Sequence, residues 1–453
     1  MTESKSSSNK SNTGLKTRKL ALEGLKAILQ QQKTLDQCFN ALFDKQSSME
    51  ARDKAFVRSL IYDVLRYKGY LEFFLKRLLR QPLKKEAHDA ELILLIGLCQ
   101  IYCMETADHA AIDTSVELIK RHKNPKVNHL SGLANGVLRN SLKQRPKLWR
   151  DAKRDPLKLL PRWLINRWEK QWGLKATRAM ARSIAFRPAL DLTLKQQESC
   201  DAWTKEFNAT SITPHHLRLV AGSDVASLKG YDGGHWWVQD LAASLPAKLF
   251  DDLNGKQVLD VCAAPGGKTM QLADYGGHVT ALDISEHRLK KVTENLERTK
   301  LSDRASIVVA DILDFKPDHP FDAILVDAPC SATGTLRRHP DGLWIKSSQT
   351  IKELAELQAS ILDNCWSLLK TGGEMVYCVC SLEQEEGEKQ LEAFLDRHAD
   401  AKPKAMDKAL QKALAGCGLD QLSYDNAALR TRPDMLADHG NVDGFFMVKL
   451  KKS

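Results

Sequence analysis

The chain has 453 residues, 43% of them hydrophobic, and a formal net charge of +10. This length predicts two or three domains that each bury a core. The first residues are too polar for a secretion signal, and no run of about eighteen apolar residues predicts a membrane span. The ten cysteines therefore indicate reduced thiols, a cytoplasmic location and no disulfide framework.

The positive charge is concentrated in the first part of the chain. Residues 1–190 contain 37 lysines and arginines against 18 aspartates and glutamates, whereas residues 191–453 contain 30 against 39. A basic region gains affinity for a polyanion by neutralising phosphates and releasing their counterions. Charge that served solubility alone would explain this concentration less well, so we favour a nucleic-acid partner.

Residues 1–14 are expected to form a disordered tail, and residues 15–145 are expected to be all-helical. Apolar residues recur in the second segment at helical spacing, as in Phe56, Leu60, Ile61, Val64 and Leu65. Several amphipathic helices of this kind form a bundle.

Residues 146–240 are predicted to be a basic linker followed by a small α/β subdomain, which begins near residue 191. The linker contains four tryptophans, Trp149, Trp163, Trp168 and Trp172, among seven arginines. We expect the tryptophans to pack against neighbouring protein and some of the arginines to contact phosphates. Stacking of the tryptophans on RNA bases is the alternative.

Residues 241–453 are predicted to form a domain in which strands and helices alternate. The predicted strands are Gln257–Ala263, His278–Asp283, Ala305–Val309, Phe321–Asp327, Glu374–Cys378 and Gly444–Leu450. This alternation predicts a doubly wound parallel sheet of the Rossmann-like α/β class, preceded by the all-α bundle. Ligands of such sheets bind at the carboxyl ends of the strands.

Three of these strands end in motifs that suit an adenosine ligand. The segment Val258–Thr269 (VLDVCAAPGGKT) joins a strand to a helix through a tight turn at Pro265, Gly266 and Gly267. It matches neither the dinucleotide nor the nucleoside-triphosphate glycine pattern. Asp283 ends the next strand, where an acid can bind ribose hydroxyls, and Asp311 follows the third, where it can bind an adenine amino group. Together they predict a site for S-adenosylmethionine.

Two further motifs each place a cysteine at the same edge of the sheet. Cys330 lies in DAPCSATG (Asp327–Gly334), and Cys380 lies in YCVCSLEQEEGE (Tyr377–Glu388). Carbon 5 of cytosine is a poor nucleophile until a thiolate adds to carbon 6, so its methylation needs a cysteine, an acid and a base. Methylation of an exocyclic amine needs none of these, and its usual D/N-P-P-Y/F pattern is absent where DAPC stands.

The set AAPGGKT, DAPCSATGTLRRHPD and CVCS followed by acidic residues resembles the RNA cytosine-5 methyltransferases of the Nol1/Nop2/Sun family. The helical segment, including ANGVLR (Ala134–Arg139), resembles the NusB RNA-binding bundle. This pairing implies a methyltransferase that acts on 16S ribosomal RNA, in the small subunit or its precursor. We expect a monomer that has no membrane contact.

The resemblance implies a role for each matching residue. Cys380 would be the nucleophile, Cys330 would assist proton removal and product release, and Asp327 would hold the base edge beside the cofactor. Asp283 would bind the ribose, and Asp311 would bind the adenine. The methionine end of the cofactor would be lined by Cys262, Ala263, Ala264, Pro265, Gly266, Gly267 and Lys268.

Several alternatives remain open at this stage. A Pro-Cys dipeptide is the nucleophile in DNA cytosine methyltransferases, so the residues alone do not decide between Cys330 and Cys380. A nearby Arg337, Arg338 or Lys268 would lower the pKa of the attacking thiol. The substrate could be transfer RNA or another RNA, a protein or a small molecule, or the chain could be a non-catalytic RNA-binding ribosome-assembly factor. We expect no metal.

Overall fold

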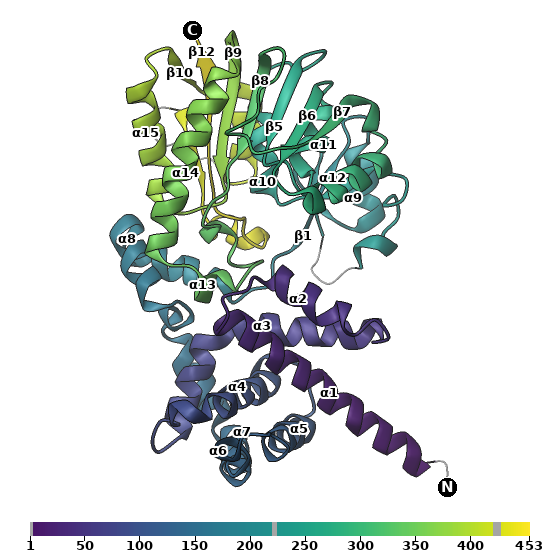
Figure 1. Cartoon of the computed structure of the whole chain (residues 1–453), viewed down its shortest axis with the longest axis vertical. Helices are drawn as coiled ribbons and strands as arrows, with labels where there is room; N and C mark the ends of the chain where they lie inside the picture. Colours follow the sequence, from purple (N-terminus) through teal and green to yellow (C-terminus); the bar gives the residue numbers. More distant parts are fainter. Residues whose placement is uncertain (1–2, 220–223, 420–426) are drawn as a thin grey trace. The chain divides into compact units, whose positions relative to one another are not determined.

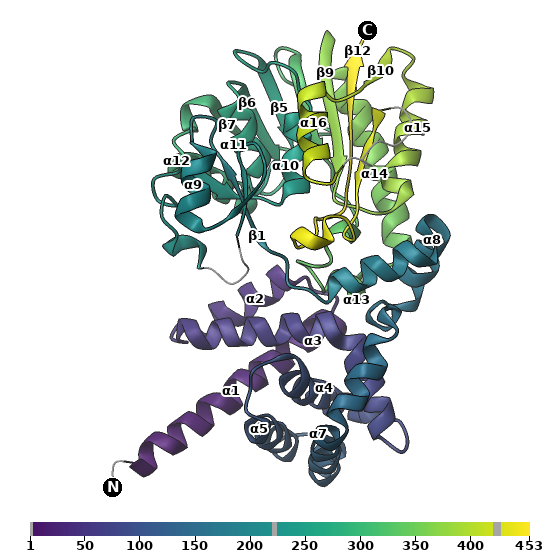
Figure 2. The same cartoon turned by 180° about the vertical axis from the view of Figure 1, so that it is seen from behind.

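The computed structural model describes residues 3–219, 224–419 and 427–453, which belong to two compact units (Figures 1 and 2). Unit 1 comprises Met1–Phe186 together with His339–Lys346, and unit 2 comprises Arg187–Arg338 together with Ser347–Ser453. Within the described ranges, we find no helix that is both long and apolar enough to span a membrane.

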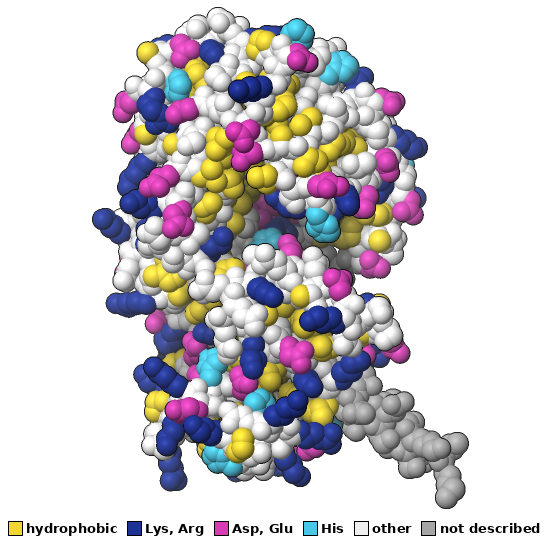
Figure 3. Space-filling model, viewed as in Figure 1, with side chains coloured by type: hydrophobic (Ala, Val, Ile, Leu, Met, Phe, Trp, Pro, Cys, Tyr) yellow, Lys and Arg dark blue, Asp and Glu magenta, His cyan; other side chains and the backbone are white. Residues whose placement is uncertain are grey.

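Unit 1 is all-helical, as predicted. Its longer helices pack around α4 (His88–Cys103), in which every residue from Leu92 to Tyr102 is buried. A helix that is apolar all round belongs in the centre of a bundle, whereas its neighbours need only one apolar face. Lys and Arg side chains are spread over the face of this unit seen in Figure 3. The other helices are α1 (Glu3–Leu29), α2 (Leu35–Asp44), α3 (Ala51–Leu78), α5 (Asp108–Lys120), α6 (Pro125–Asn128), α7 (Ser131–Lys153) and α8 (Arg162–Ile184).

Two expectations for this unit can be compared with the structure. The backbone of Glu3–Gly14 continues α1, which differs from the expected disordered tail, while Met1 and Thr2 lie outside the described residues. Two of the four linker tryptophans, Trp149 and Trp168, pack against protein as expected. Trp168 is buried, and the ring of Trp149 lies about 6 Å from the rings of Tyr70 and Phe74.

The segment His339–Lys346 belongs to unit 1, although in the sequence it lies between two parts of unit 2. It contains the short helix α13 (Gly342–Ile345). An Asp341 carboxylate oxygen accepts a hydrogen bond of 3.0 Å from the backbone N–H of Leu35, at the start of α2. The Trp344 indole donates a hydrogen bond of 2.8 Å to the carbonyl of Leu65, and the Lys68 ammonium lies 4.1 Å from the centre of the indole ring. These contacts make the segment an integral part of the helical unit.

Unit 2 begins with a small antiparallel sheet in the order β2-β3-β1-β4. This confirms a small α/β segment before the larger sheet. Its elements are β1 (Leu190–Leu194), α9 (Cys200–Phe207), β2 (Thr210–Thr213), β3 (His216–Leu219) and β4 (Trp236–Val238). Trp236 and Trp237 are both buried: Trp236 lies in the apolar cluster of the small sheet, and Trp237 lies in the core that includes α10.

The larger sheet has the order β10-β12-β9-β8-β5-β6-β7, and β11 pairs with β12. Strands β9, β8, β5, β6 and β7 are parallel, as predicted. The predicted strand Gly444–Leu450 is β12, but it runs antiparallel to β9, so the sheet is mixed. β11 carries the chain to the carboxyl edge of the sheet. Because β12 starts at this edge, it must run in the direction opposite to β9. The bounds are β5 (Gln257–Val261), β6 (His278–Asp283), β7 (Ala305–Val309), β8 (Phe321–Asp327), β9 (Leu369–Val379), β10 (Ala401–Lys404), β11 (Leu429–Thr431) and β12 (Phe445–Lys452).

Helices cover both faces of this sheet. Figure 1 shows α14 (Ser348–Ser367) and α15 (Glu388–Arg397) on one face, and Figure 2 shows α10 (Leu241–Lys248) and α16 (Lys408–Gly416) on the other. The helices α11 (Gly267–Asp274) and α12 (Glu286–Arg298) contribute to the same apolar core as α10. With both faces covered, the carboxyl edge is where the parallel strands can present side chains to a ligand.

Candidate active site

The glycine-rich turn after β5 lies at the carboxyl edge of the sheet. Cys262 and Gly266 have positive φ angles of 61° and 102°. A Cβ atom on Gly266 would lie 3.1 Å from a side-chain methyl of Val292 in α12, so both the backbone conformation and the packing favour glycine there. The turn delivers Gly267 and Lys268 to the start of α11.

The two predicted cofactor acids follow the neighbouring strands β6 and β7. The Asp283 carboxylate accepts hydrogen bonds from the backbone N–H groups of Ala264, at 3.3 Å, and Ser285, at 2.9 Å. It therefore ties the glycine-rich turn to the end of β6. Asp311 accepts a hydrogen bond of 2.9 Å from the N–H of Leu313. The Ala310 N–H donates to the carbonyl of Asp283, which joins the two strand ends.

Asp260, in β5, is a buried acid that the motif analysis did not single out. One carboxylate oxygen accepts a hydrogen bond of 2.6 Å from the Thr269 hydroxyl, and the other has no hydrogen-bond partner among the described residues. Burial raises the pKa of Asp260 to about 7. An unpaired buried oxygen in this position can accept a hydrogen bond from a cationic or amine ligand.

Two apolar side chains beside the cofactor acids are exposed. Ile284, directly after Asp283, is 70% exposed, and Leu313, two residues after Asp311, is 40% exposed. Large exposed aliphatic side chains next to two acids suit a ligand that combines a flat apolar ring with hydroxyl and amino groups. The motifs named only the acids, although both leucine and isoleucine stand within a few residues of them.

The two motif cysteines meet at the carboxyl edge. Cys330 follows β8 and Cys380 follows β9, and their sulfur atoms are 3.4 Å apart. The hydrogen bond with Cys380, together with burial, raises the pKa of Cys330 well above its usual range. Cys330 is therefore a neutral thiol that can donate a hydrogen bond to the neighbouring sulfur.

Cys378, which shares the CVC motif, is set apart from this pair. It lies within β9, is fully buried, and its sulfur is 3.5 Å from an Asp327 carboxylate oxygen. Burial and the nearby Asp327 charge raise the pKa of Cys378 well above its usual range. A buried, protonated thiol inside the strand is a small core residue and is not available as a nucleophile.

Asp327 is held by a lysine from the glycine-rich turn. The Lys268 ammonium lies 2.7 Å from a carboxylate oxygen of Asp327 and 5.3 Å from the centre of the Phe445 ring. Burial alone would lower the pKa of Lys268, but the Asp327 carboxylate outweighs it and raises that pKa above its usual range. The lysine is therefore charged, and it joins the glycine-rich turn to the strand end beside the cysteines.

Glu386 is a site residue that the sequence analysis missed. Its buried carboxylate accepts four hydrogen bonds: from the backbone N–H of Ser331 at 2.8 Å, from the hydroxyls of Ser331 and Ser381 at 2.5 Å each, and from the Gln358 amide at 3.1 Å. Ser331 follows Cys330 and Ser381 follows Cys380, so one carboxylate joins the two cysteine loops. Burial raises the pKa of Glu386. The sequence offered only an acidic run, EQEEGE, in which no residue type distinguishes this position.

A close contact of Gly334 and an ion pair of Glu388 also stabilise the connection between the two cysteine loops. The Gly334 N–H donates to the carbonyl of Cys380, and a Cβ atom on Gly334 would meet the carbonyl oxygen of Gly444 at 1.9 Å, so no other residue fits. Arg430 forms a bidentate ion pair with Glu388, at 2.6 and 2.9 Å, and also donates to the carbonyl of Ser381.

From the sequence, Arg337 and Arg338 are cations that could lower the pKa of the attacking thiol, but both side chains bind carboxylates. Arg337 donates to Asp443 at 2.8 Å, and Arg338 pairs with both Asp240 and Asp443 at 2.7 Å. Buried carboxylates therefore engage both guanidinium groups, which anchors the segment after the DAPC loop to the core of unit 2. Of the three cations considered, Lys268 is the one joined to the cysteine region.

The remaining cysteines do not suggest another centre. Cys99 is buried in α4, and Cys103 is partly buried at the end of that helix. Over the described ranges, no group of three or more His, Cys, Asp or Glu side chains is arranged to hold a metal ion.

Comparison with known proteins identifies relatives over nearly the whole chain. Residues 247–451 match the family described as 16S rRNA methyltransferase RsmB/F, and residues 15–143 match the NusB family. The chain is 34% identical over 452 residues to Ribosomal RNA small subunit methyltransferase B of Cronobacter sakazakii, covering 96% of this chain and 98% of that protein. It is 35% identical to the protein of the same name from Yersinia enterocolitica, covering 85% of this chain and 91% of the relative.

Solved structures share the fold. The crystal structure of PH0851 aligns with a TM-score of 0.72 at 20% sequence identity, over 97% of this chain and 99% of that one. The structure of NSun6 from Pyrococcus horikoshii with SFG aligns with a TM-score of 0.54 at 18% identity, over 64% of this chain and 98% of that one. The Rossmann-like sheet preceded by a NusB-like bundle is thereby confirmed.

Proposed function

The chain belongs to the RsmB/F family of small-subunit ribosomal RNA methyltransferases, and on that premise we propose that it methylates carbon 5 of a specific cytosine in 16S ribosomal RNA. The single observation that carries the choice of carbon 5 is the contact between Cys330 and Cys380, whose sulfurs are 3.4 Å apart. Base methylation at carbon 5 requires a thiol nucleophile, whereas methylation of an amine or a ribose hydroxyl does not.

The methyl donor is S-adenosylmethionine, which supplies an electrophilic methyl group on a sulfonium. The residues at the carboxyl edge fit this molecule. Asp283 would bind the ribose hydroxyls, Asp311 the adenine amino group, and the exposed Ile284 the face of the adenine ring. The unpaired oxygen of Asp260 and the turn Cys262–Lys268 would hold the methionine end.

In the proposed reaction, the Cys380 thiol first releases its proton to solvent. The resulting thiolate bonds to carbon 6 of the cytosine, and the electron pair of the carbon 5–carbon 6 double bond becomes available at carbon 5. Asp327 accepts a hydrogen bond from the amino group at the base edge, and Lys268 keeps Asp327 in place. After carbon 5 has taken the methyl group, its proton is removed. The electron pair of that C–H bond re-forms the double bond, and Cys380 leaves carbon 6.

Cys330 is proposed to act on the proton and on the leaving sulfur. Its raised pKa keeps it as a thiol, which can donate a hydrogen bond to the Cys380 sulfur both as it attacks and as it departs. To act on carbon 5, Cys330 first gives its own proton to solvent; the resulting thiolate then removes the carbon 5 proton and becomes a thiol again. Removing Cys330 should therefore slow release of the product more than it slows formation of the covalent adduct.

Trapping on RNA that contains 5-fluorocytosine separates the two cysteines. Fluorine cannot leave carbon 5 as a cation, so the adduct persists once the methyl group has been transferred. We expect a stable adduct with the Cys330→Ala variant and none with Cys380→Ala. An adduct in Cys380→Ala and none in Cys330→Ala would reverse the assignment.

Bisulfite sequencing of ribosomal RNA tests the substrate. Cells that lack this gene should lose one 5-methylcytosine from 16S ribosomal RNA, and cells that carry the Cys380→Ala gene should lose the same one. An unchanged 16S pattern with a loss in transfer RNA would keep the cysteine chemistry and move the substrate. No loss in any RNA would refute the proposed activity.

A further inference from the structure

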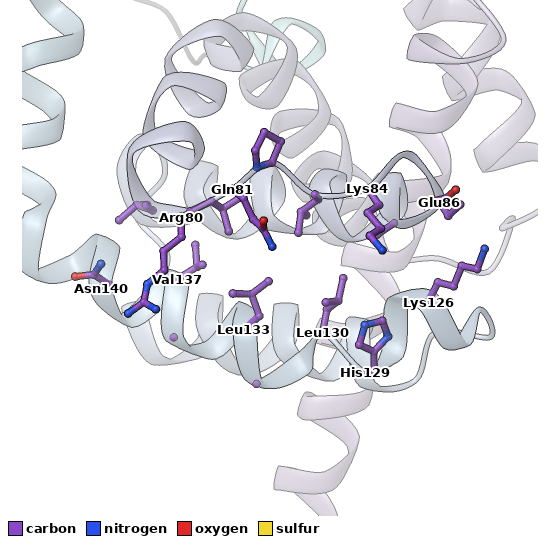
Figure 4. A pocket seen from close by; sticks show the side chains of 17 residues that line it. Arg80, Gln81, Lys84, Glu86, Lys126, His129, Leu130, Leu133, Val137 and Asn140 are labelled. Carbon is purple, nitrogen blue, oxygen red and sulfur yellow. The ribbon is translucent and has the colours of Figure 1, made fainter.

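Unit 1 has a groove with an apolar floor, which the catalytic site does not use. Its volume is about 950 Å³, and it lies between the segment that follows α3 on one side and α6 and α7 on the other (Figure 4). Leu130 and Leu133 project from the α7 side toward the opposite wall, and Leu133 is 41% exposed. The other apolar side chains that line the groove are Leu78, Leu79, Pro82, Leu83, Ala87 and Val137.

The rim of the groove is cationic. Arg80 lies toward one end, while Lys84 and Lys126 lie toward the other (Figure 4). All three side chains are exposed, and none forms an ion pair among the residues that the structure describes. Glu86 is the one acid in the lining. Exposed cations that no carboxylate neutralises favour a polyanionic occupant.

Two glycines of α7 line the same groove, Gly132 in the first turn of the helix and Gly136 in its interior. Gly132 and Gly136 are one turn apart on α7, and a Cβ atom built on either would have no atom within 4 Å. Glycine lowers helix stability relative to alanine, and packing within the described chain gives no reason for it here. A bare strip of helix backbone does allow an external molecule to approach closely.

We propose that this groove binds a single-stranded segment of the RNA substrate, separate from the cytosine that is methylated. Unpaired bases would lie on the leucine and proline surface beside the two glycines, and the phosphates between them would reach Arg80, Lys84 and Lys126. A duplex hides its bases and would leave the apolar floor unused. The inference rests on the proposed function, since that function makes RNA the substrate.

Gly136→Leu tests the groove without removing any contact. A Cβ atom at this position meets open space, and leucine has a higher helix propensity than glycine, so the variant should be at least as stable as the natural protein. We expect the Kd for a 16S ribosomal RNA transcript, measured by filter binding, to rise about tenfold. Gly416→Leu, on α16 of unit 2, where a Cβ atom also meets open space, is the matched control and should leave that Kd unchanged. Binding by Gly136→Leu within twofold of the natural protein would overturn the proposal.

The combined variant Arg80→Ala, Lys84→Ala and Lys126→Ala tests the phosphate contacts. Each phosphate contact to a single strand contributes about 0.7 to the slope of log Kd against log salt concentration, so that slope should fall by about 2. An unchanged slope would show that the three side chains do not contact RNA, and it would leave a protein segment as the occupant of the groove. Binding is measured without methyl transfer, so a natural protein that binds the transcript but does not methylate it would refute the proposed function alone.

Discussion

Replacing Glu386 by alanine removes the acceptor that the two cysteine loops share. Four donors lose their partner, but the Ser331 and Ser381 hydroxyls are 3.1 Å apart and can bond to each other. The Ser331 N–H and one N–H of the Gln358 amide then remain buried without an acceptor, while the other Gln358 N–H still donates to the Pro329 carbonyl. Each such group costs about 1–3 kcal/mol, which predicts a loss of about 4 kcal/mol in the free energy of unfolding.

Glutamine at the same position should behave differently. Its amide oxygen can accept from the Ser331 N–H and from Gln358, while its amino group donates to the serine hydroxyls, which can turn to accept. We therefore expect Glu386→Gln to lie within about 1 kcal/mol of the natural protein. Because burial raises the folded-state pKa of Glu386, the natural protein should lose stability relative to Glu386→Gln as the pH rises through that pKa.

Two measurements separate a general loss of stability from a displacement of the cysteines. Urea unfolding gives the free energies, and the rate of adduct formation on 5-fluorocytosine RNA, measured where each variant is folded, reports the geometry of the pair. Glu386→Ala should slow adduct formation at least tenfold, and Glu386→Gln should restore most of the rate. Glu392→Ala, on the exposed face of α15, is the neutral control. An alanine variant that is as stable and as fast as the natural protein would refute the role assigned to Glu386.

Further variants test the cofactor site and the segment inserted into unit 1. Asp260 has a folded-state pKa of about 7, above its unfolded value of about 3.9, so it contributes stability that is lost as the pH rises through 7. In urea unfolding, the natural protein should lose about 3 kcal/mol between pH 5 and pH 8, and the Asp260→Asn variant should not. The same loss in Asp260→Asn would contradict the prediction. Ile284→Ser should weaken S-adenosylmethionine binding about tenfold in calorimetry with no change in melting temperature, and unchanged affinity would place the adenine elsewhere. Trp344→Ala removes an indole that packs on the core of unit 1 and bonds to Leu65, so the unfolding free energy of that unit should fall by about 3 kcal/mol; protease resistance of residues 15–186 equal to that of the natural protein would argue against this.

Much of the catalytic domain could be predicted because its strands carry clear boundaries. The predicted bounds of His278–Asp283, Ala305–Val309 and Phe321–Asp327 equal those of β6, β7 and β8, since a run of apolar residues ends at an aspartate or a turn in each case. The strand predicted as Gln257–Ala263 ends earlier, at Val261, because Cys262 takes a left-handed conformation that begins the turn. Apolar pattern alone does not report such a backbone angle.

The contacts across the site depend on tertiary structure and could not be read from local pattern. The motifs placed Cys330 and Cys380 at one edge, but the hydrogen bonds between two loops set their separation. Within EQEEGE, Glu383, Glu386 and Glu388 are all buried, so neither burial nor residue type singles out Glu386; its hydrogen bonds with Ser331 and Ser381 do. Arg337 and Arg338 look available in the sequence, whereas Asp240 and Asp443, distant along the chain, engage them.

The segment His339–Lys346 has a consequence for synthesis on the ribosome. The helical unit is the first to emerge, yet its last piece is made about 150 residues after Phe186. At about 5–20 residues per second, the nascent bundle waits roughly 10–30 s for Asp341 to reach the start of α2 and for Trp344 to reach Leu65. During that interval the apolar surface that Trp344 and Ile345 cover is open to other proteins, including chaperones. The helical unit therefore cannot complete its fold until the first four strands of the methyltransferase sheet, β5 to β8, have been translated.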